Sequence, residues 1–425
     1  MRVQPSPSFR GRFKVPGDKS ISHRAAILGG LAEGDTLIRN YSSAADCAST
    51  LGCLEALGVA VSRDGEVVVV HGQGPERWRE PSGPLDAGNS GSTLRMLAGP
   101  LAARPFRSVL TGDESLRRRP VERVAQPLRA MGARASGVDG RPPLTIDGGP
   151  LRGIAWELKV ASAQVKTAVL LAGLQAEGTT SVREGQRSRD HTERLLPAFG
   201  AQVARDGLTT SVRGGQTLRG CPVDVPGDAS SAAFLVVAAL IRPSSEVRID
   251  DVLLNPRRAA FVDVLRRMGG RIETGVVRES PEPVGFIVAR SSELRGTTIG
   301  GDVMAELIDE VPALAVAAAH AEGPTTISDA AELRVKESDR IAALAEGLRQ
   351  MGAEVEERPD GLVLAGGARL RGATVRAHDD HRIAMALGIA ALAAHGETLV
   401  EGSECASVSF PDFWEILARG ASGGR

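Results

Sequence analysis

The sequence predicts an α/β protein built from six repeats of one unit of helices and strands, three repeats in each half of the chain. One phrase that recurs roughly every 70 residues, a second phrase interleaved with it, and one long-range duplication predict this class. With 425 residues, the chain is also too long for one simple core at roughly 150 residues per domain.

The first recurring phrase has the form Leu-x-x-apolar-Gly. Its glycines are Gly58, Gly132, Gly200, Gly269 and Gly352, with a degraded sixth copy at Gly420. The pattern predicts an amphipathic helix that ends at a glycine just past its last turn, followed by a strand such as those beginning near Ala133 and Ala353.

The second phrase joins an Ala/Leu-rich helix through a small-residue turn to a β-rich stretch. It occurs at residues 31–38, 175–182, 320–327 and 394–400. Each repeat therefore holds two helices and several strands, which makes it longer than a solenoid repeat and suits a compact α+β unit.

The duplication is the largest symmetry. Val15-Pro-Gly-Asp-Lys-Ser returns as Val225-Pro-Gly-Asp-Ala-Ser, but the second copy lacks counterparts of Lys19, His23 and Arg24. Pro-Gly turns are natural crossover points. We therefore predict one domain from residues 1–17 and 226–425 and a second from residues 18–225, with the chemistry in the cleft between them.

The composition excludes several classes of protein. Hydrophobic residues make up 42% and charged residues 24%, which is ordinary for a soluble globular protein. Apolar runs reach only about ten residues, too short to span a bilayer, and the N-terminus lacks a signal-peptide core, so we expect a cytoplasmic protein. The formal net charge of −1 argues against a nucleic-acid binder.

Lysine is rare in this chain. Only five of the 51 basic residues are Lys, at positions 14, 19, 159, 166 and 336. Arg cannot copy a compact ammonium group, so the remaining lysines are candidates for function. The four cysteines form no metal-binding or disulfide pattern.

Polar, cation-bearing phrases stand directly before apolar helices. Ser20 or Ser22 can cap the helix after residue 18, with Lys19 and Arg24 beside its free N–H groups, as in anion sites. An ordinary capped helix with solvated charges is the alternative. His23 is more typical of a packed helix residue than of a catalyst.

Three further phrases in the first half have the same design. A Gly/Ser loop at 88–92, with Asn89 and Gly91, leads into a helix expected at 94–101; such a loop is a plain turn as often as a phosphate cradle. Arg119 ends a run of three arginines whose repulsion an oxyanion would relieve, although most charge runs are solvated. A polar cluster at 187–191 contains Arg189.

The phrase at 161–166 presents hydroxyl, amide and ammonium groups together. Ser162, Ala163, Gln164 and Lys166 open an apolar helix, which suits a polyol ligand that carries a phosphate. A serine cap explains Ser162 but neither Gln164 nor Lys166.

The second half offers candidate acids and bases. Asp309 and Glu310 precede Pro312 and an apolar run, where they are either acids favoured by the helix dipole or a general base beside an apolar wall. Glu337 lies next to Lys336 and close to Arg340.

Two more cation-bearing segments complete the set. Lys336 and Arg340 are four residues apart, which predicts one helical face, and a solvated ion-pair helix is the default for such a string. Arg382 stands at the start of another apolar helix, with His381 as a positioning residue. Together the phrases predict helix N-termini and about six cations around substrates with phosphate and carboxylate groups.

The phrases closely resemble those of the 5-enolpyruvylshikimate-3-phosphate (EPSP) synthases, a family of enolpyruvyl transferases. The most specific matches are residues 16–24 and 334–340, and the matches run in order from about residue 15 to residue 413. The resemblance implies a two-domain inside-out α/β barrel of six βαβαββ-like units. It implies transfer of the enolpyruvyl group of phosphoenolpyruvate to the 5-hydroxyl of shikimate 3-phosphate, which needs no cofactor. Nothing in the sequence demands an oligomer, so we expect a monomer.

The resemblance also assigns residues to substrates. The shikimate 3-phosphate site would contain Lys19, Ser20, Arg24, Ser162, Ala163, Gln164, Arg189, Asp309 and Lys336. The phosphoenolpyruvate site would contain Lys19, Asn89, Gly91, Arg119, Gln164, Arg340, His381 and Arg382. Asp309 would take the hydroxyl proton, and Glu337 with Lys19 would protonate the methylene carbon. Glyphosate occupies the phosphoenolpyruvate site in this family.

Two alternatives and two departures accompany this assignment. The related transferases that act on UDP-N-acetylglucosamine carry a reactive Cys in the loop before Arg-Pro, whereas residues 111–120 contain none. A non-catalytic anion-binding protein would gain nothing from Asp309 and Glu337. Ser90 and Ser92 vary the family's usual loop, and residues 407–411 lack the Lys that some members carry.

Overall fold

The computed structural model describes residues 1–423. Within them the chain forms two compact units, one of residues 1–16 and 226–423 and one of residues 17–225. We call them the outer-chain unit and the inner-chain unit. The chain leaves each unit at a Pro-Gly-Asp turn.

The inner-chain unit has three four-stranded sheets among the residues described. The first, in spatial order, is β14 (Val223–Asp224), β3 (Glu33–Arg39), β5 (Val67–Gln73) and β4 (Ala60–Asp64). The second is β6 (Leu85–Asp86), β7 (Arg107–Thr111), β9 (Arg141–Asp147) and β8 (Arg134–Val138). The third is β10 (Ala155–Leu158), β11 (Thr179–Glu184), β13 (Thr209–Arg213) and β12 (Val203–Asp206).

The outer-chain unit, as far as it is described, has three sheets of the same kind. They are β16 (Arg271–Arg278), β17 (Val284–Arg290), β15 (Glu246–Leu253) and β2 (Arg10–Phe13); β18 (Thr298–Ile299), β19 (Thr325–Ile327), β21 (Gly361–Leu364) and β20 (Val355–Arg358); and β1 (Arg2–Val3), β23 (Thr398–Glu401) and β22 (Thr374–Arg376). In each sheet one parallel pair is followed by antiparallel pairing.

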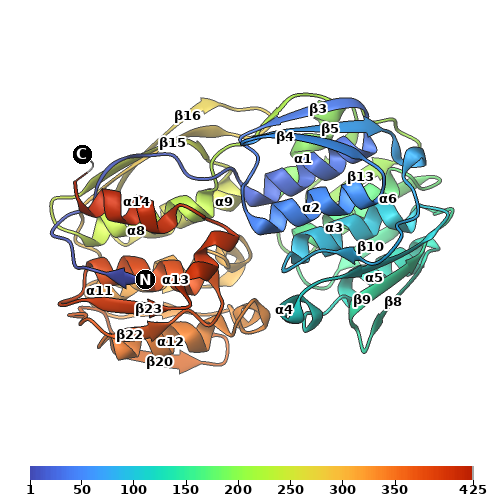
Figure 1. The fold of residues 1–425 in the computed structure, drawn as a ribbon. Coiled ribbons are helices and arrows are strands. Elements are labelled where there is room, and N and C mark those ends of the chain that lie inside the picture. The colour runs from blue at the N-terminus through green and yellow to red at the C-terminus, as the bar shows by residue number, and fades with distance from the viewer. Residues whose placement is uncertain (424–425) are drawn as a thin grey trace. The chain divides into compact units, whose positions relative to one another are not determined.

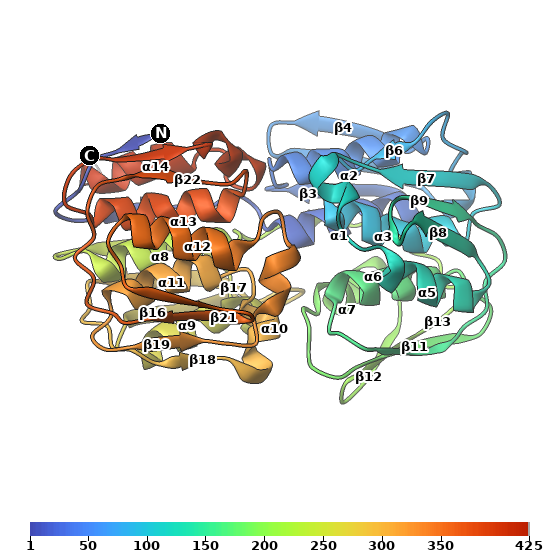
Figure 2. The same ribbon diagram turned by 90° about the horizontal axis from the view of Figure 1, so that it is seen from below.

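Each unit encloses three apolar helices. They are α1 (Lys19–Leu31), α3 (Gly91–Ala102) and α6 (Ala163–Gly173) in the inner-chain unit, and α8 (Ala229–Ile241), α11 (Val311–His320) and α13 (His381–Leu392) in the outer-chain unit. Nearly every residue of these helices is buried, as expected of helices that are apolar on all sides. Within each unit the sheets lie outside these helices (Figures 1 and 2). The predicted six-repeat, inside-out α/β class is confirmed.

A second set of helices connects the strands, and all of them except α7 are partly exposed. It comprises α2 (Ala45–Ala56), α5 (Glu122–Met131), α7 (His191–Leu195), α9 (Pro256–Arg267), α12 (Arg340–Gln350) and α14 (Phe413–Ala421). Shorter turns are α4 (Glu114–Arg117), α10 (Met304–Leu307) and the 3-10 helices η1 (Pro75–Arg77), η2 (Leu196–Phe199), η3 (Gly301–Val303), η4 (Ala331–Val335) and η5 (Ser403–Val408).

The predicted helix-ending glycines are confirmed in five of the six repeats. Positive φ angles occur at Gly58, Gly132, Gly200, Gly269 and Gly352. The helix that ends at Gly200 is the 3-10 helix η2. Gly420 is different, because it lies inside α14 rather than after it. A Cβ there would lie 2.2 Å from the Phe9 ring, so this glycine allows close packing instead of ending a helix.

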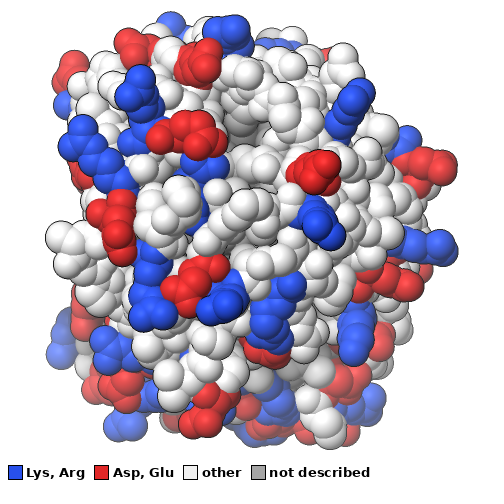
Figure 3. All heavy atoms as spheres, turned by 90° about the vertical axis from the view of Figure 1, so that its right-hand side faces the viewer, with Lys and Arg blue, Asp and Glu red and all other residues white. Residues whose placement is uncertain are grey.

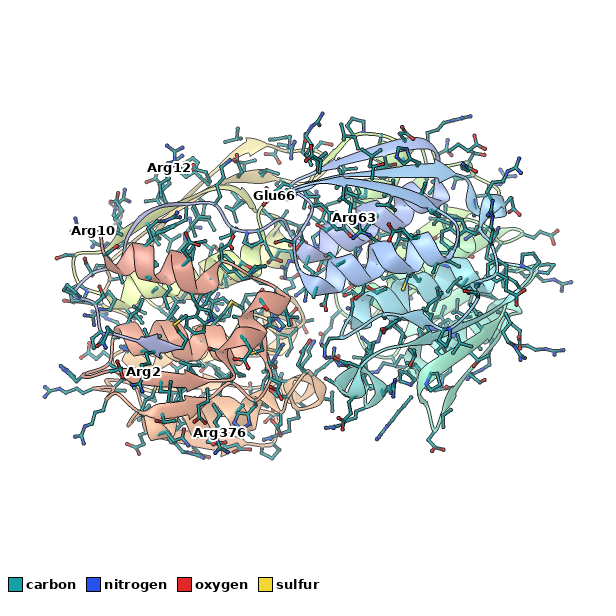
Figure 4. All side chains as sticks on the ribbon, viewed as in Figure 1. Arg2, Arg10, Arg12, Arg63, Glu66 and Arg376 are labelled. Atoms are coloured by element: carbon teal, nitrogen blue, oxygen red, sulfur yellow. The ribbon has the colours of Figure 1, made fainter. Side chains whose placement is uncertain are left out.

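Most of the numerous arginines lie on the outside. Arg2, Arg12 and Arg376 lie at the periphery of the ribbon (Figure 4) and pair with Glu397, Asp250 and Glu401. On the face of the inner-chain unit in Figure 3, basic and acidic side chains are intermixed. Exposed ion pairs of this kind contribute little stability, so the buried cations are the informative ones.

None of the helices in residues 1–423 is long and apolar enough to cross a membrane.

Candidate functional site

The buried helices of the inner-chain unit begin close together. Lys19 Nζ on α1 donates to Asp46 Oδ2 over 2.7 Å, and the Asp46 carbonyl accepts from Thr93 of α3. Arg24 on α1 contacts the Ala163 carbonyl at the start of α6 at 3.4 Å. Gln164 Nε2 of α6 donates to Ser92 Oγ of α3 over 2.8 Å. The three N-termini, each a partial positive charge, therefore meet at one end of the unit.

The caps of these helices agree only in part with the prediction. Ser162 caps α6 as expected, accepting from the Val165 N–H. The cap of α1 is Asp18, which accepts from the Ile21 N–H over 2.8 Å, and not Ser20 or Ser22. Asp18 is the residue with extended ψ directly before the helix, and a carboxylate at that point also meets the helix dipole.

The loop before α3 holds two of the predicted residues together. Helix α3 begins at Gly91, three residues earlier than expected, because Ser90 caps it. Arg119 Nη2 donates to Asn89 Oδ1 over 2.9 Å. A Cβ on Gly91 would lie in ordinary contact with Arg119 Nη1 at 3.5 Å but only 2.7 Å from Arg95 Nη1, so a side chain here would displace the Arg95 guanidinium.

Arg24 is held by a network of hydroxyl groups. Its Nε donates to Thr192 Oγ1 over 2.8 Å and its Nη2 to Thr167 Oγ1 over 3.0 Å, and the two hydroxyls bond to each other. Its Nη1 donates to the Ser20 carbonyl over 2.9 Å. Such a fixed fork is suited to an oxyanion. Arg189 is half-buried in the loop before α7, and its part in this cluster stays a prediction.

Lys166 is not presented to a ligand, in contrast to the sequence interpretation. Its Nζ lies 2.6 Å from Glu184 and 2.7 Å from Glu193, and the side chain is only 1% exposed. An ammonium group between two buried carboxylates holds α6, β11 and α7 together. Lys166 therefore belongs to the support beneath the cluster.

His23 is buried on the inner side of α1. Burial and the neighbouring Lys19 and Arg24 lower the pKa of His23 to about 3, against the attraction of Asp46. The neutral ring bonds through Nδ1 to Thr50 Oγ1 over 2.6 Å, and Thr50 bonds to Thr93. The imidazole thus joins α1, α2 and α3 as a packed residue, as its sequence context suggested.

The predicted residues of the outer-chain unit surround Asp309, which lies between α10 and α11. Asp309 Oδ1 is 3.4 Å from Arg340 Nη1, 3.8 Å from Lys336 Nζ and 3.9 Å from Arg382 Nε. Its carbonyl accepts from Arg382 Nη1 over 2.7 Å. Four residues from distant parts of the sequence thus form one cluster of charge.

Arg340 is the centre of this cluster. Its Nε donates to Asp380 over 2.7 Å and its Nη2 to Glu337 over 2.6 Å, while the side chain is 1% exposed. Burial alone would lower the pKa of Arg340, but the carboxylates of Asp380, Glu337 and Asp309 raise it above its ordinary value. Arg340 is therefore a permanent cation that orients two candidate acid–base groups, Asp309 and Glu337.

The local backbone corrects one prediction here. Lys336 and Arg340 do not share a helical face, because Lys336 follows η4 in a non-helical backbone conformation and α12 begins only at Arg340. Asp339 caps α12 by accepting from the Ala342 N–H, so the helix begins after Lys336. The two cations still converge, because both contact Asp309.

The start of α13 has the predicted form. Asp380 caps the helix by accepting from the Arg382 N–H over 2.9 Å, and His381 is buried beside it. Sequence reasoning missed Asp46 and Asp380 as partners of Lys19 and Arg340, since acidic residues are too common to single out without their contacts. It also missed Arg95, which donates to Gln164. Within residues 1–423, no group of three or more His, Cys, Asp or Glu side chains could hold a metal ion.

The comparisons with known proteins agree over the whole chain. The family model described as EPSP synthase (3-phosphoshikimate 1-carboxyvinyltransferase) matches residues 3–417. The 3-phosphoshikimate 1-carboxyvinyltransferase of Brevibacillus brevis is 50% identical, with 99% of each chain covered. That of Pelotomaculum thermopropionicum is 52% identical, with 99% of this chain and 98% of the relative covered.

Solved structures give the same result. The EPSP synthase of Acinetobacter baumannii superposes with a TM-score of 0.88 at 42% identity, covering 99% of this chain and 97% of that one. The enolpyruvyl transferase NikO of Streptomyces tendae shares the fold, with a TM-score of 0.80 at 21% identity and coverage of 98% and 96%. The chain therefore belongs to the EPSP synthase family.

Proposed function

We propose that the chain transfers the enolpyruvyl group of phosphoenolpyruvate to the 5-hydroxyl of shikimate 3-phosphate, releasing phosphate. The observation that carries this is an identity of 50% and more, over nearly the full length, to relatives named 3-phosphoshikimate 1-carboxyvinyltransferase. The two clusters support it, because substrates with two phosphates and two carboxylates require several fixed cations.

Shikimate 3-phosphate would be bound mainly by the Arg24 cluster. Arg24 is fixed by two threonine hydroxyls, and the start of α6 offers N–H groups to a phosphate. The residues proposed for this substrate are Lys19, Ser20, Arg24, Ser162, Ala163, Gln164, Arg189, Asp309 and Lys336.

Phosphoenolpyruvate would be bound by guanidinium groups from both units. Arg119 stands beside Gly91 in one unit, and Arg340 and Arg382 stand beside Asp309 in the other. The residues proposed for this substrate are Lys19, Asn89, Gly91, Gln164, Arg119, Arg340, His381 and Arg382. We propose that both units act on one substrate pair, with the boundaries expected at residues 17 and 225.

Asp309 and Glu337 would carry out the proton transfers. The 5-hydroxyl oxygen would attack C2 of phosphoenolpyruvate while Asp309 takes the hydroxyl proton. Glu337 with Lys19 would protonate C3. The tetrahedral intermediate would then lose phosphate and a proton from C3, which restores the double bond. One guanidinium, that of Arg340, contacts both carboxylates and so fixes their separation, and no step requires a cofactor.

A phosphate-release assay tests this proposal. Purified protein with shikimate 3-phosphate and phosphoenolpyruvate should release phosphate, and omission of either substrate should abolish the release. Turnover with UDP-N-acetylglucosamine in place of shikimate 3-phosphate would instead support the related transferase reaction. Binding of both substrates without any turnover would support a non-catalytic anion-binding protein.

Two further parts of the proposal concern the cell. We expect a cytoplasmic monomer, since the four cysteines show no disulfide spacing and the reaction needs only one chain. Light scattering after size-exclusion chromatography measures the mass, and a mass well above 44.4 kDa would contradict the monomer.

A further inference from the structure

A buried charged cluster includes Glu310, the residue that follows Asp309 in the chain, and none of its members is among the proposed substrate contacts. We call Arg258, Asp228, Ser230 and Glu310 the anchor cluster. Arg258 Nη2 donates to Asp228 Oδ1 over 3.0 Å and to Ser230 Oγ over 2.9 Å, and Nη1 lies 3.4 Å from Glu310 Oε1. The Ser230 hydroxyl also donates to Glu310 Oε1.

The anchor cluster joins three helices of one unit. Arg258 is in the first turn of α9, Asp228 caps α8 by accepting from the Ser230 N–H over 2.7 Å, and Glu310 is the residue before α11. The Arg258 side chain is 2% exposed and that of Glu310 is fully buried. One guanidinium thus ties the start of α11 to the start of α8.

Asp309 and Glu310 are adjacent in the chain, but their carboxylates contact different sets of residues. The Asp309 carboxylate lies among Lys336, Arg340 and Arg382, whereas the Glu310 carboxylate lies in the anchor cluster. Because one peptide bond joins the two residues, the position of the Glu310 side chain limits where the Asp309 carboxylate can lie. The Glu310 carbonyl also accepts the first hydrogen bond of α11, from the Leu314 N–H over 3.0 Å.

We propose that Arg258 is a positioning residue for the reaction: it holds Glu310, and through Glu310 it places the Asp309 carboxylate for proton transfer. This inference rests on the proposed function of Asp309. Neither Arg258 nor Glu310 contacts substrate in this arrangement, so their effect is on geometry. Misplacement of a catalytic group by about 1 Å can cost on the order of 100-fold in rate.

The same contacts argue against a second anion site at this place. The N-terminus of α8 is the duplicate of the N-terminus of α1, but Ala229 replaces Lys19. Asp228 takes the N–H groups of α8, and the protein's own Glu310 takes the Ser230 hydroxyl. With two carboxylates already facing one guanidinium, an added anion would meet repulsion.

The test compares truncation with a conservative change at Glu310. Glu310→Ala removes the anchor, and we expect kcat for phosphate release to fall about 10- to 100-fold, while KM for each substrate changes less than about 3-fold. Glu310→Gln keeps an oxygen that can accept from Ser230 and Arg258, so it should restore kcat to within about 3-fold of wild type. A merely structural role would not produce this rescue or this separation of kcat from KM.

Arg258→Met should give the same kcat defect, and Arg104→Met is its matched control. Arg104 is also a buried guanidinium, bonded to the Pro75 carbonyl and Gln175 in the other unit. Both variants should lose thermal stability, but only Arg258→Met should lose kcat per folded molecule, with folded protein counted by calorimetric binding of shikimate 3-phosphate. If Arg258→Met does not fold, Ser230→Ala replaces it, with a smaller defect expected.

The outcomes separate the inference from the proposed function. Wild-type protein that releases no phosphate contradicts the proposed function itself. Active wild type together with unchanged kcat per folded molecule in Glu310→Ala overturns the positioning role alone. A kcat for Glu310→Gln as low as that of Glu310→Ala also overturns it, because the anchor would then depend on something other than these hydrogen bonds.

Discussion

Gly91→Ala adds one methyl group at the first residue of α3. The new Cβ would lie 2.7 Å from Arg95 Nη1 and 3.5 Å from Arg119 Nη1. The first distance is shorter than real Cβ contacts, so the Arg95 guanidinium must move. Because this group is the far end of a flexible side chain, we expect the variant to fold normally and to show its effect on ligands.

The contacts of Arg95 give the size of the effect. Its Nη1 donates to Gln164 Oε1 over 2.8 Å, and Gln164 is proposed to contact both substrates. Loss of a hydrogen bond to a charged group is worth about 1.5–3 kcal/mol, or roughly 10- to 100-fold in affinity. Glyphosate is slightly longer than phosphoenolpyruvate, so its inhibition constant should rise by this factor and the KM for phosphoenolpyruvate by less.

Initial rates of phosphate release, with phosphoenolpyruvate and glyphosate both varied, measure the two constants. Wild type should be sensitive to glyphosate, because Gly91 leaves room for it. Gly52→Ala is the control, since Gly52 is exposed on α2 and an added Cβ there meets nothing within 4 Å. Equal inhibition constants for wild type and Gly91→Ala would show that the loop before α3 does not lie against the phosphoenolpyruvate site.

Three further predictions concern single buried or charged groups. Asp309→Asn removes the proposed general base, so kcat should fall at least about 100-fold. Calorimetry should show that the variant still binds shikimate 3-phosphate. Near-normal turnover would remove Asp309 from the mechanism. Lys166→Met leaves Glu184 and Glu193 buried without their cation, so the free energy of unfolding in urea should fall by about 3–5 kcal/mol, and a loss under about 1 kcal/mol would contradict this. Burial lowers the pKa of His23 to about 3 in the folded protein, against about 6.5 in the unfolded chain. Below pH 6.5 the unfolded chain therefore binds a proton that the folded protein does not, and the free energy of unfolding should fall by about 1.4 kcal/mol per pH unit. His23→Asn should reduce this slope, and an unchanged slope would show that another group titrates.

The parts of the fold that depend on local chemistry could be predicted from the sequence. The glycines at 58, 132, 269 and 352 end helices because a positive φ is needed within a residue or two of the last turn, and this requirement shows in the sequence itself. The fully apolar helices likewise had to be enclosed by other elements.

Ion-pair partners could not be predicted, because they come from distant segments. The spacing of Lys336 and Arg340 predicts one helix, yet Asp339 caps α12 and excludes Lys336 from it. The rarity of lysine in this chain predicts a ligand-binding role for Lys166, but the residue is enclosed between two carboxylates. Its partners Glu184 and Glu193 lie 18 and 27 residues away, and only the fold brings them to it.

The duplicated Pro-Gly-Asp turns show how one local design can serve two purposes. Asp18 and Asp228 both cap a buried helix, so the cap was retained in both copies. After Asp18 the chain places Lys19, which extends to Asp46 and carries a positive charge at the helix start. After Asp228 it places Ala229, and the charge comes instead from Arg258 on the next helix, enclosed with Glu310. The Lys19 side chain is 17% exposed at the start of its helix, whereas Arg258 contacts the protein's own Asp228, Ser230 and Glu310. The same turn therefore precedes a cation proposed to touch substrate in one unit, and a cluster proposed to position Asp309 in the other.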